Sequence, residues 1–84
     1  MNARHRKTLE AVFADPVSGS IKWRDIEAML IAVGAEVSEA RGSRVSVRLT
    51  GSRAVFHRPS PSPDTDKGAV KAIRRFLRNA GVNP

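Results

Sequence analysis

The segment Gly42–Pro59, GSRVSVRLTGSRAVFHRP, decides the fold of this chain. Apolar side chains alternate with Arg or Ser over residues 44–49, a period of two that is typical of a strand with one buried face. Thr50-Gly51 then supplies a two-residue turn into a second run, Ser52 to Arg58. The segment therefore predicts a β-hairpin with one apolar face and one basic face.

The length of the turn sets which residues of the hairpin face each other. With a two-residue turn, the expected cross-strand pairs are Val47 with Ala54, Val45 with Phe56, Arg48 with Arg53, and Arg44 with His57. A three-residue loop would shift the register by one residue and place His57 beside Val45 instead. The expected Arg44–His57 pair therefore depends on the two-residue turn.

The basic face of the hairpin is suited to phosphate. It carries no acidic residue, and its cationic and imidazole side chains are Arg44, Arg48, Arg53, His57 and Arg58. The planar guanidinium matches phosphate oxygens, and imidazole gains and loses a proton near neutral pH. We predict that these arginines contact RNA phosphates. The alternative is a solvated strand face that prevents edge-to-edge aggregation.

Composition points to a polyanionic partner. Fifteen Lys and Arg, of which eleven are Arg, stand against eight Asp and Glu in 84 residues, giving a formal charge of +7. Nucleic acid and an acidic protein surface both supply the matching charge. The chain has no cysteine and only two distant histidines, so we expect no metal site and no cofactor. Its longest apolar run, Ala28–Val33, is too short to span a bilayer, and a cytoplasmic soluble protein is expected.

Two helices are expected before the hairpin. The first runs from Arg4 to Ala14 and is stopped by Asp15-Pro16, because the residue before proline avoids the helical region. After a turn at residues 17–20, apolar residues recur at helical spacing from Ile26 to Val33, and Gly34 is placed to end that helix. Trp23, at its start, is expected in the core rather than stacked on a base. Residues 35–40 form at best a short strand.

A third helix is expected after the hairpin. Prolines 59, 61 and 63 predict a stiff exposed connection, closed by the helix-start residues Asp64-Thr65-Asp66. The helix from Lys67 to Ala80 has an apolar stripe and a basic face of Lys71, Arg74, Arg75 and Arg78, and Gly81 ends it. We predict RNA contacts for Lys71 and Arg75, although such a face is often merely solvated.

The expected order of elements is therefore α-α-β-β-β-α. It predicts an α+β fold in which a three-stranded antiparallel sheet packs against helices. The chain is expected to form a single domain, residues 1–84, with an N-terminal helical extension and turn at 1–20 and a core at 21–84.

From Trp23 onward, the order of motifs resembles the HicA family of bacterial toxins. The resemblance is carried by the helix and glycine stop of Asp25–Ala35, by Gly42-Ser43 at the strand start, and by a closing helix from Lys67 that ends in Ala80-Gly81-Val82. It implies a fold similar to double-stranded-RNA-binding domains (dsRBD-like). It also implies a ribonuclease that cleaves messenger RNA without metal and is silenced by a HicB-type antitoxin.

The resemblance also bears on the catalytic residues. The family's catalytic histidine follows the Gly-Ser pair, where this chain has Arg44, and arginine stays protonated and cannot act as a general base. Phe56-His57-Arg58-Pro59 resembles the His-Pro segment that precedes the family's last helix. We therefore predict that His57 is a relocated catalytic base, with Arg44 or Arg58 stabilising charge. His5, on the basic N-terminus, is a weaker candidate.

The sequence supports three hypotheses for the function. The first is a HicA-like toxin that acts on single-stranded messenger RNA and is paired with a HicB-type antitoxin. The second is a catalytically inactive RNA-binding module in which His57 is only a structural residue of an edge strand. The third is a DNA-binding partner in a regulatory complex, which would prefer duplex DNA to RNA.

Overall fold

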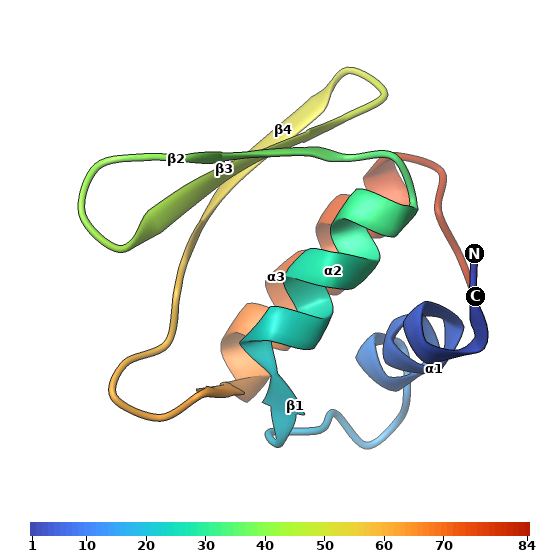
Figure 1. Ribbon diagram of the computed structural model, residues 1–84. Coiled ribbons are helices and arrows are strands. Elements are labelled where there is room, and N and C mark those ends of the chain that lie inside the picture. The colour runs from blue at the N-terminus through green and yellow to red at the C-terminus, as the bar shows by residue number, and fades with distance from the viewer.

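Three helices and two small antiparallel sheets make up the computed structural model, which describes residues 1–84. The elements, in chain order, are α1 (Ala3–Val12), β1 (Ile21–Lys22), α2 (Trp23–Ala32), β2 (Glu36–Glu39), β3 (Arg44–Leu49), β4 (Ser52–His57), β5 (Asp64–Thr65) and α3 (Lys67–Asn79). Figure 1 shows α2 and α3 lying beneath the sheet β2-β3-β4, with the two chain termini close together beside α1. The α+β prediction, with a three-stranded antiparallel sheet packed against helices, is confirmed, and the arrangement is consistent with a dsRBD-like fold.

The hairpin has the predicted register. Thr50 and Gly51 form its turn with φ of 44° and 82°, the positive values that suit a two-residue hairpin turn. The cross-strand partners include Arg44 with His57 and Arg48 with Arg53. Inward-facing residues of β3 are buried while their neighbours along the strand are exposed or half-buried. The apolar face of the hairpin therefore points to the helices and the basic face points to solvent.

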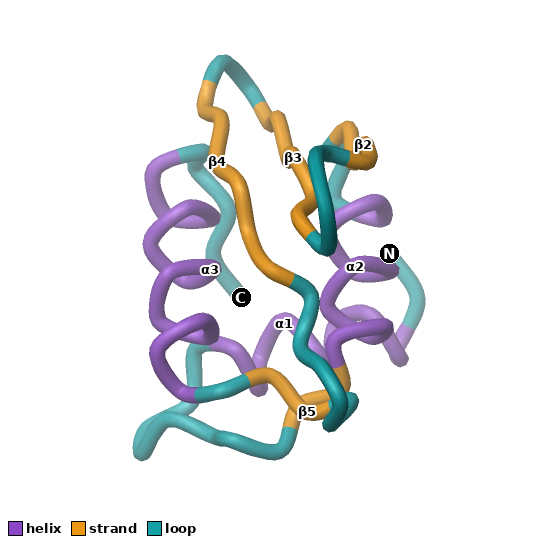
Figure 2. The backbone as a smooth tube through the Cα atoms, turned by 90° about the vertical axis from the view of Figure 1, so that its left-hand side faces the viewer, coloured by secondary structure: helices purple, strands orange, loops and turns teal.

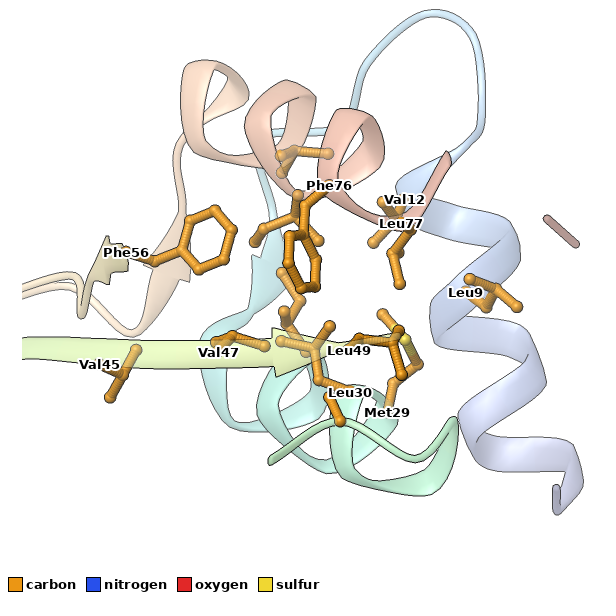
Figure 3. Close-up of a cluster of buried hydrophobic side chains, with 14 of the residues drawn as sticks. Leu9, Val12, Met29, Leu30, Val45, Val47, Leu49, Phe56, Phe76 and Leu77 are labelled. Carbon is orange, nitrogen blue, oxygen red and sulfur yellow. The ribbon is translucent and has the colours of Figure 1, made fainter. Parts of the chain in front are cut away.

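One hydrophobic core joins the sheet to all three helices. Its fifteen buried apolar residues are Leu9, Val12, Trp23, Ile26, Met29, Leu30, Ala35, Val45, Val47, Leu49, Phe56, Val70, Ile73, Phe76 and Leu77. In Figure 3 the side chains of β3 and β4 meet those of α2 and α3, and Leu9 and Val12 of α1 close one end. Trp23 is only 6% exposed, so its predicted place in the core is confirmed. The helices therefore cover one face of the sheet and leave the other face open.

The helix boundaries follow local signals. Asp66 caps α3, since its side chain accepts a hydrogen bond from the Ala69 N–H at 2.7 Å. Gly34 has φ of 104°, a backbone conformation that favours glycine, and it turns the chain from α2 into β2. The first helix ends earlier than the predicted Ala14, because the chain already leaves helical geometry at Phe13.

Arg74 explains how α1 is attached. Its guanidinium donates to the carbonyl oxygens of Val12 and Ala14, both at 2.9 Å, and its side chain is only 11% exposed. These carbonyls lie at and just beyond the C-terminal end of α1, where a cation is favourable. The position of Arg74 along the helix predicted that it would belong to the solvated basic face of α3. Its contacts with the end of α1 show that this prediction was wrong for Arg74.

The predicted element order omitted the ribbon formed by β1 and β5. Ile21 pairs with Thr65 and Lys22 with Asp64, and the Lys22 ammonium lies 2.6 Å from the Asp64 carboxylate. Asp64 and Thr65 were expected to start the helix, but only Asp66 caps it. The short ribbon ties the proline-rich connection to the start of α2. There the backbone N–H of Trp23 also donates to the Pro63 carbonyl.

Candidate RNA-binding surface

The open face of the sheet brings together four of the predicted site residues. Arg44 and Arg48 come from β3, and Arg53 and His57 from β4; all four are exposed. They face solvent because they alternate with buried residues along β3 and with buried or half-buried residues along β4. We call this set, Arg44, Arg48, Arg53 and His57, the basic face.

The hydrogen-bond pattern brings the paired side chains of the basic face close. The Arg58 N–H donates to the Ser43 carbonyl at 2.9 Å, so the next pair along the ladder, Arg44 with His57, is a non-hydrogen-bonded pair. Such pairs have Cα atoms only about 4.5 Å apart, with adjacent side chains. The same alternation makes Arg48 with Arg53 a non-hydrogen-bonded pair too.

Few partners inside the chain neutralise this face. Arg48 has a long ion pair with Glu36 at 3.9 Å, and both side chains are well exposed. Arg53 donates to the Ser46 hydroxyl at 3.3 Å, and Arg44 donates to the Arg41 carbonyl at 3.3 Å. Two arginines placed directly opposite each other repel, because like charges across strands destabilise a sheet. An anion bound between them would relieve that repulsion.

Arg58 lies on the other side of the sheet. It donates two hydrogen bonds to the Glu39 carboxylate, both at 2.7 Å, and one to Glu27 Oε1 at 2.9 Å. Trp23 Nε1 donates to the same Glu27 oxygen at 2.7 Å. The guanidinium that was predicted to contact RNA is thus occupied by two carboxylates.

This cluster of Arg58 with Glu27 and Glu39 has clear electrostatics. The hydrogen bonds from Arg58 lower the pKa of Glu39 below its usual value, although desolvation opposes them. The hydrogen bonds from Glu39 and Glu27 raise the pKa of Arg58 further above its already high value. Pairing therefore favours the charged form of both side chains, with Glu39 deprotonated and Arg58 protonated. The cluster ties the ends of β2 and β4 to α2, next to His57.

Sequence reasoning missed this cluster although one signal was present. Side chains alternate between the two faces of a strand. Arg58, which follows the outward-facing His57, must therefore point inward, toward the helices. Its carboxylate partners lie 31 and 19 residues away along the chain, so pairing with them depends on the fold.

The two predicted sites on α3 are exposed and lie one helical turn apart. Arg75 borders a groove between β4 and α3 that Arg53 also borders, so α3 adds to the positive charge beside the basic face. Lys71 lies one turn earlier and forms no ion pair within the chain. Arg78, nearer the end of the same helix, lies with its guanidinium carbon 5.4 Å from the centre of the Phe13 ring.

No group of three or more His, Asp or Glu residues is placed to hold a metal ion. None of the helices has the length and apolar character needed to cross a membrane.

Comparison with known proteins identifies the family. Neither the curated proteins nor the solved structures gave a match. A family comparison matches residues 23–82, from the start of α2 to just beyond α3, to the HicA toxin family of bacterial toxin-antitoxin systems. The match spans most of the chain and includes the whole sheet that carries the basic face. The chain therefore belongs to the HicA toxin family, whose members have a cognate antitoxin as partner.

Proposed function

We propose that this chain is a toxin that cleaves messenger RNA without a metal ion and is neutralised by a HicB-type antitoxin. One observation supports this function above all: the exposed Arg44–His57 pair on a face of the sheet that is otherwise arginine-rich. A proton-transfer group and a phosphate-binding group lie side by side there. Acting on messenger RNA, the protein would work in the cytoplasm.

The proposed reaction uses the two residues in different roles. The neutral imidazole of His57 removes the proton from a ribose 2′-hydroxyl, and the 2′-oxygen forms a bond to the adjacent phosphorus. The bond from phosphorus to the 5′-oxygen breaks, and that oxygen takes up a proton from the imidazolium or from water. The products are a 2′,3′-cyclic phosphate and a 5′-hydroxyl. The Arg44 guanidinium contacts the non-bridging oxygens, where negative charge develops.

The position of Arg44 gives the proposal a structural basis. In the family that the chain resembles, the catalytic histidine follows the Gly-Ser pair, and Gly42-Ser43 is followed here by Arg44. His57 is the direct cross-strand partner of Arg44. A histidine on β4 therefore occupies nearly the same region of the surface as a histidine at position 44 on β3. We infer that the base has moved across the hairpin while the site has stayed in place.

Arg48 and Arg53 are proposed to bind the RNA backbone further along the basic face, and Lys71 and Arg75 to extend that path onto α3. A strand residue advances by about 3.3 Å, so two pairs separated by four residues lie about 13 Å apart. This distance is comparable to about two nucleotides of extended RNA backbone. Arg58 is assigned a structural role, since Glu27 and Glu39 already occupy its donors.

A second candidate function is a catalytically inactive RNA-binding module. The replacement of the histidine after Gly-Ser by Arg44 favours this alternative, because a guanidinium cannot accept the 2′-hydroxyl proton. The basic face would then hold RNA without cutting it. Cleavage in the presence of a chelator separates the two candidates.

The test compares the wild-type chain with His57→Ala on a labelled single-stranded RNA, with His5→Ala as the control. His5 is a histidine on α1, outside the sheet. We expect the wild type and His5→Ala to produce 2′,3′-cyclic ends and His57→Ala to lose cleavage while still binding RNA. Equal cleavage by His57→Ala would refute the assigned base. Binding without cleavage by the wild type would establish the inactive module instead.

A further inference from the structure

The β4 strand has an open edge. It is the last strand of the sheet, and its only strand partner is β3. Because Ser43 and Arg58 are hydrogen-bonded across the hairpin, every second residue of β4 directs its backbone groups toward β3. The N–H and C=O groups of the alternate residues, Arg53, Val55 and His57, point away from β3, and no other backbone bonds to them.

This edge borders a groove of about 470 Å³ between β4 and α3. Figure 2 shows β4 running beside α3 on the side opposite to β3. Apolar residues from both elements line the groove, including Ala54 and Phe56 from β4 and Ala72 and Phe76 from α3. Val55, on the same strand, leaves 48% of its surface exposed. The groove thus combines unpaired backbone groups with apolar surface.

The charged residues around the groove are all basic. Arg53 borders it on β4 and Arg75 borders it on α3, and no Asp or Glu is among its lining residues. Acidic side chains on an occupant would be attracted by both walls. An extended peptide satisfies both the N–H and the C=O groups of a strand edge, whereas the phosphates of RNA only accept hydrogen bonds and would leave the C=O groups without a donor. The groove therefore fits an acidic β-strand better than RNA.

We propose that an extended acidic segment of the antitoxin adds to the β4 edge as a fourth strand of the sheet. Its backbone would pair with Arg53, Val55 and His57, its apolar side chains would enter the groove, and its carboxylates would meet Arg53 and Arg75. The added strand would lie beside His57. This docking mode rests on the proposed function, since the antitoxin would then silence the toxin by covering one side of its catalytic residue.

Val55→Pro tests the pairing because proline lacks the N–H that points outward at this position. On either side of Val55, the bonds of β4 to β3 come from Ala54 and Phe56, and proline is tolerated on edge strands where its nitrogen faces solvent. Val55→Thr is the matched control, since threonine keeps the N–H and a β-branched shape. The probe is the purified HicB-type antitoxin that the proposed function assigns as the partner.

We expect Val55→Pro to weaken binding of that protein at least tenfold and Val55→Thr to bind within about twofold of the wild type. RNA cleavage by each free variant is measured separately, so loss of antitoxin binding is distinguished from failure of the proposed nuclease function. Unchanged affinity of a folded Val55→Pro variant would overturn the docking mode.

Amide hydrogen exchange in the wild-type chain gives a second test that does not depend on folding of a variant. In the complex, the amides of Arg53, Val55 and His57 should exchange at least tenfold more slowly than in the free chain. Those of Ala54 and Phe56 are already bonded to β3 and should change little. Exchange of the three outward amides that is unaltered by the antitoxin would overturn the proposal. Slowing by a single-stranded RNA but not by the antitoxin would assign the groove to RNA instead.

Discussion

The register of the hairpin determines whether Arg44 and His57 can act together, and Phe56 offers a direct test of it. Phe56 is 7% exposed and packs against two rings, Trp23 at 6.3 Å and Phe76 at 5.9 Å between centroids. The adjacent residue, Val55, is 48% exposed. A shift of one residue would exchange the environments of Phe56 and Val55. It would also separate Arg44 from His57.

The change Phe56→Leu keeps an apolar side chain but removes both aromatic contacts. Each aromatic pair contributes about 0.5–1.5 kcal/mol beyond the buried area, so we expect the free energy of unfolding to fall by about 1–3 kcal/mol. For a domain of this size, that loss lowers the melting temperature by about 4–8 °C per kcal/mol. The chain should stay folded, since 84 residues correspond to a total stability of about 4–13 kcal/mol.

Urea unfolding followed by circular dichroism measures the change, with Val55→Thr as the control on the same strand. We expect Val55→Thr to alter the free energy of unfolding by less than about 0.5 kcal/mol, as exposed substitutions usually do. A double-mutant cycle with Phe76→Leu should give a coupling energy of about 0.5–1.5 kcal/mol. A larger loss for Val55→Thr than for Phe56→Leu would show that the register is wrong.

Three further predictions concern single charged residues. Arg53→Gln should weaken RNA binding and lower the slope of log K against log salt by about 0.7, the value for one phosphate contact on a single strand, and an unchanged slope would remove Arg53 from the interface. Because Arg58 lowers the pKa of Glu39, this pair stabilises the fold above the ordinary glutamate pKa and loses that contribution as pH falls through the lowered value. Glu39→Gln should therefore flatten the decline of melting temperature in acid, and a decline as steep as that of the wild type would contradict the pairing. Arg74→Lys should cost about 1–3 kcal/mol in urea unfolding, because one ammonium cannot replace both guanidinium bonds to the end of α1; a cost near zero would mean that Arg74 does not fasten that helix.

The hairpin was predictable from the sequence because its signals are local. Alternation of apolar and basic residues over 44–49 and the turn at Thr50-Gly51 together specify which side chains face solvent and which residues pair. The basic face is a direct consequence of that alternation. The helical stripes of α2 and α3 were equally clear, since each repeats over several turns.

Features that depend on distant residues were not predictable in the same way. The β1–β5 ribbon has two residues in each strand, too few for any periodicity, and it joins segments more than 40 positions apart in the chain. Arg74 lies on the basic face of its helix in sequence, but the backbone of α1, about 60 residues earlier, occupies that face. Tertiary packing decides such contacts.

Cleavage of labelled single-stranded RNA, with a chelator present, by His57→Ala and by the exchange variant Arg44→His/His57→Arg tests the central claim most directly. The double variant restores a histidine after Gly42-Ser43, directly opposite position 57. If the base has moved across the hairpin, the single variant will lose cleavage and the double variant will recover it with 2′,3′-cyclic ends. Full cleavage by the single variant, or no recovery in a folded double variant that still binds RNA, would contradict the account.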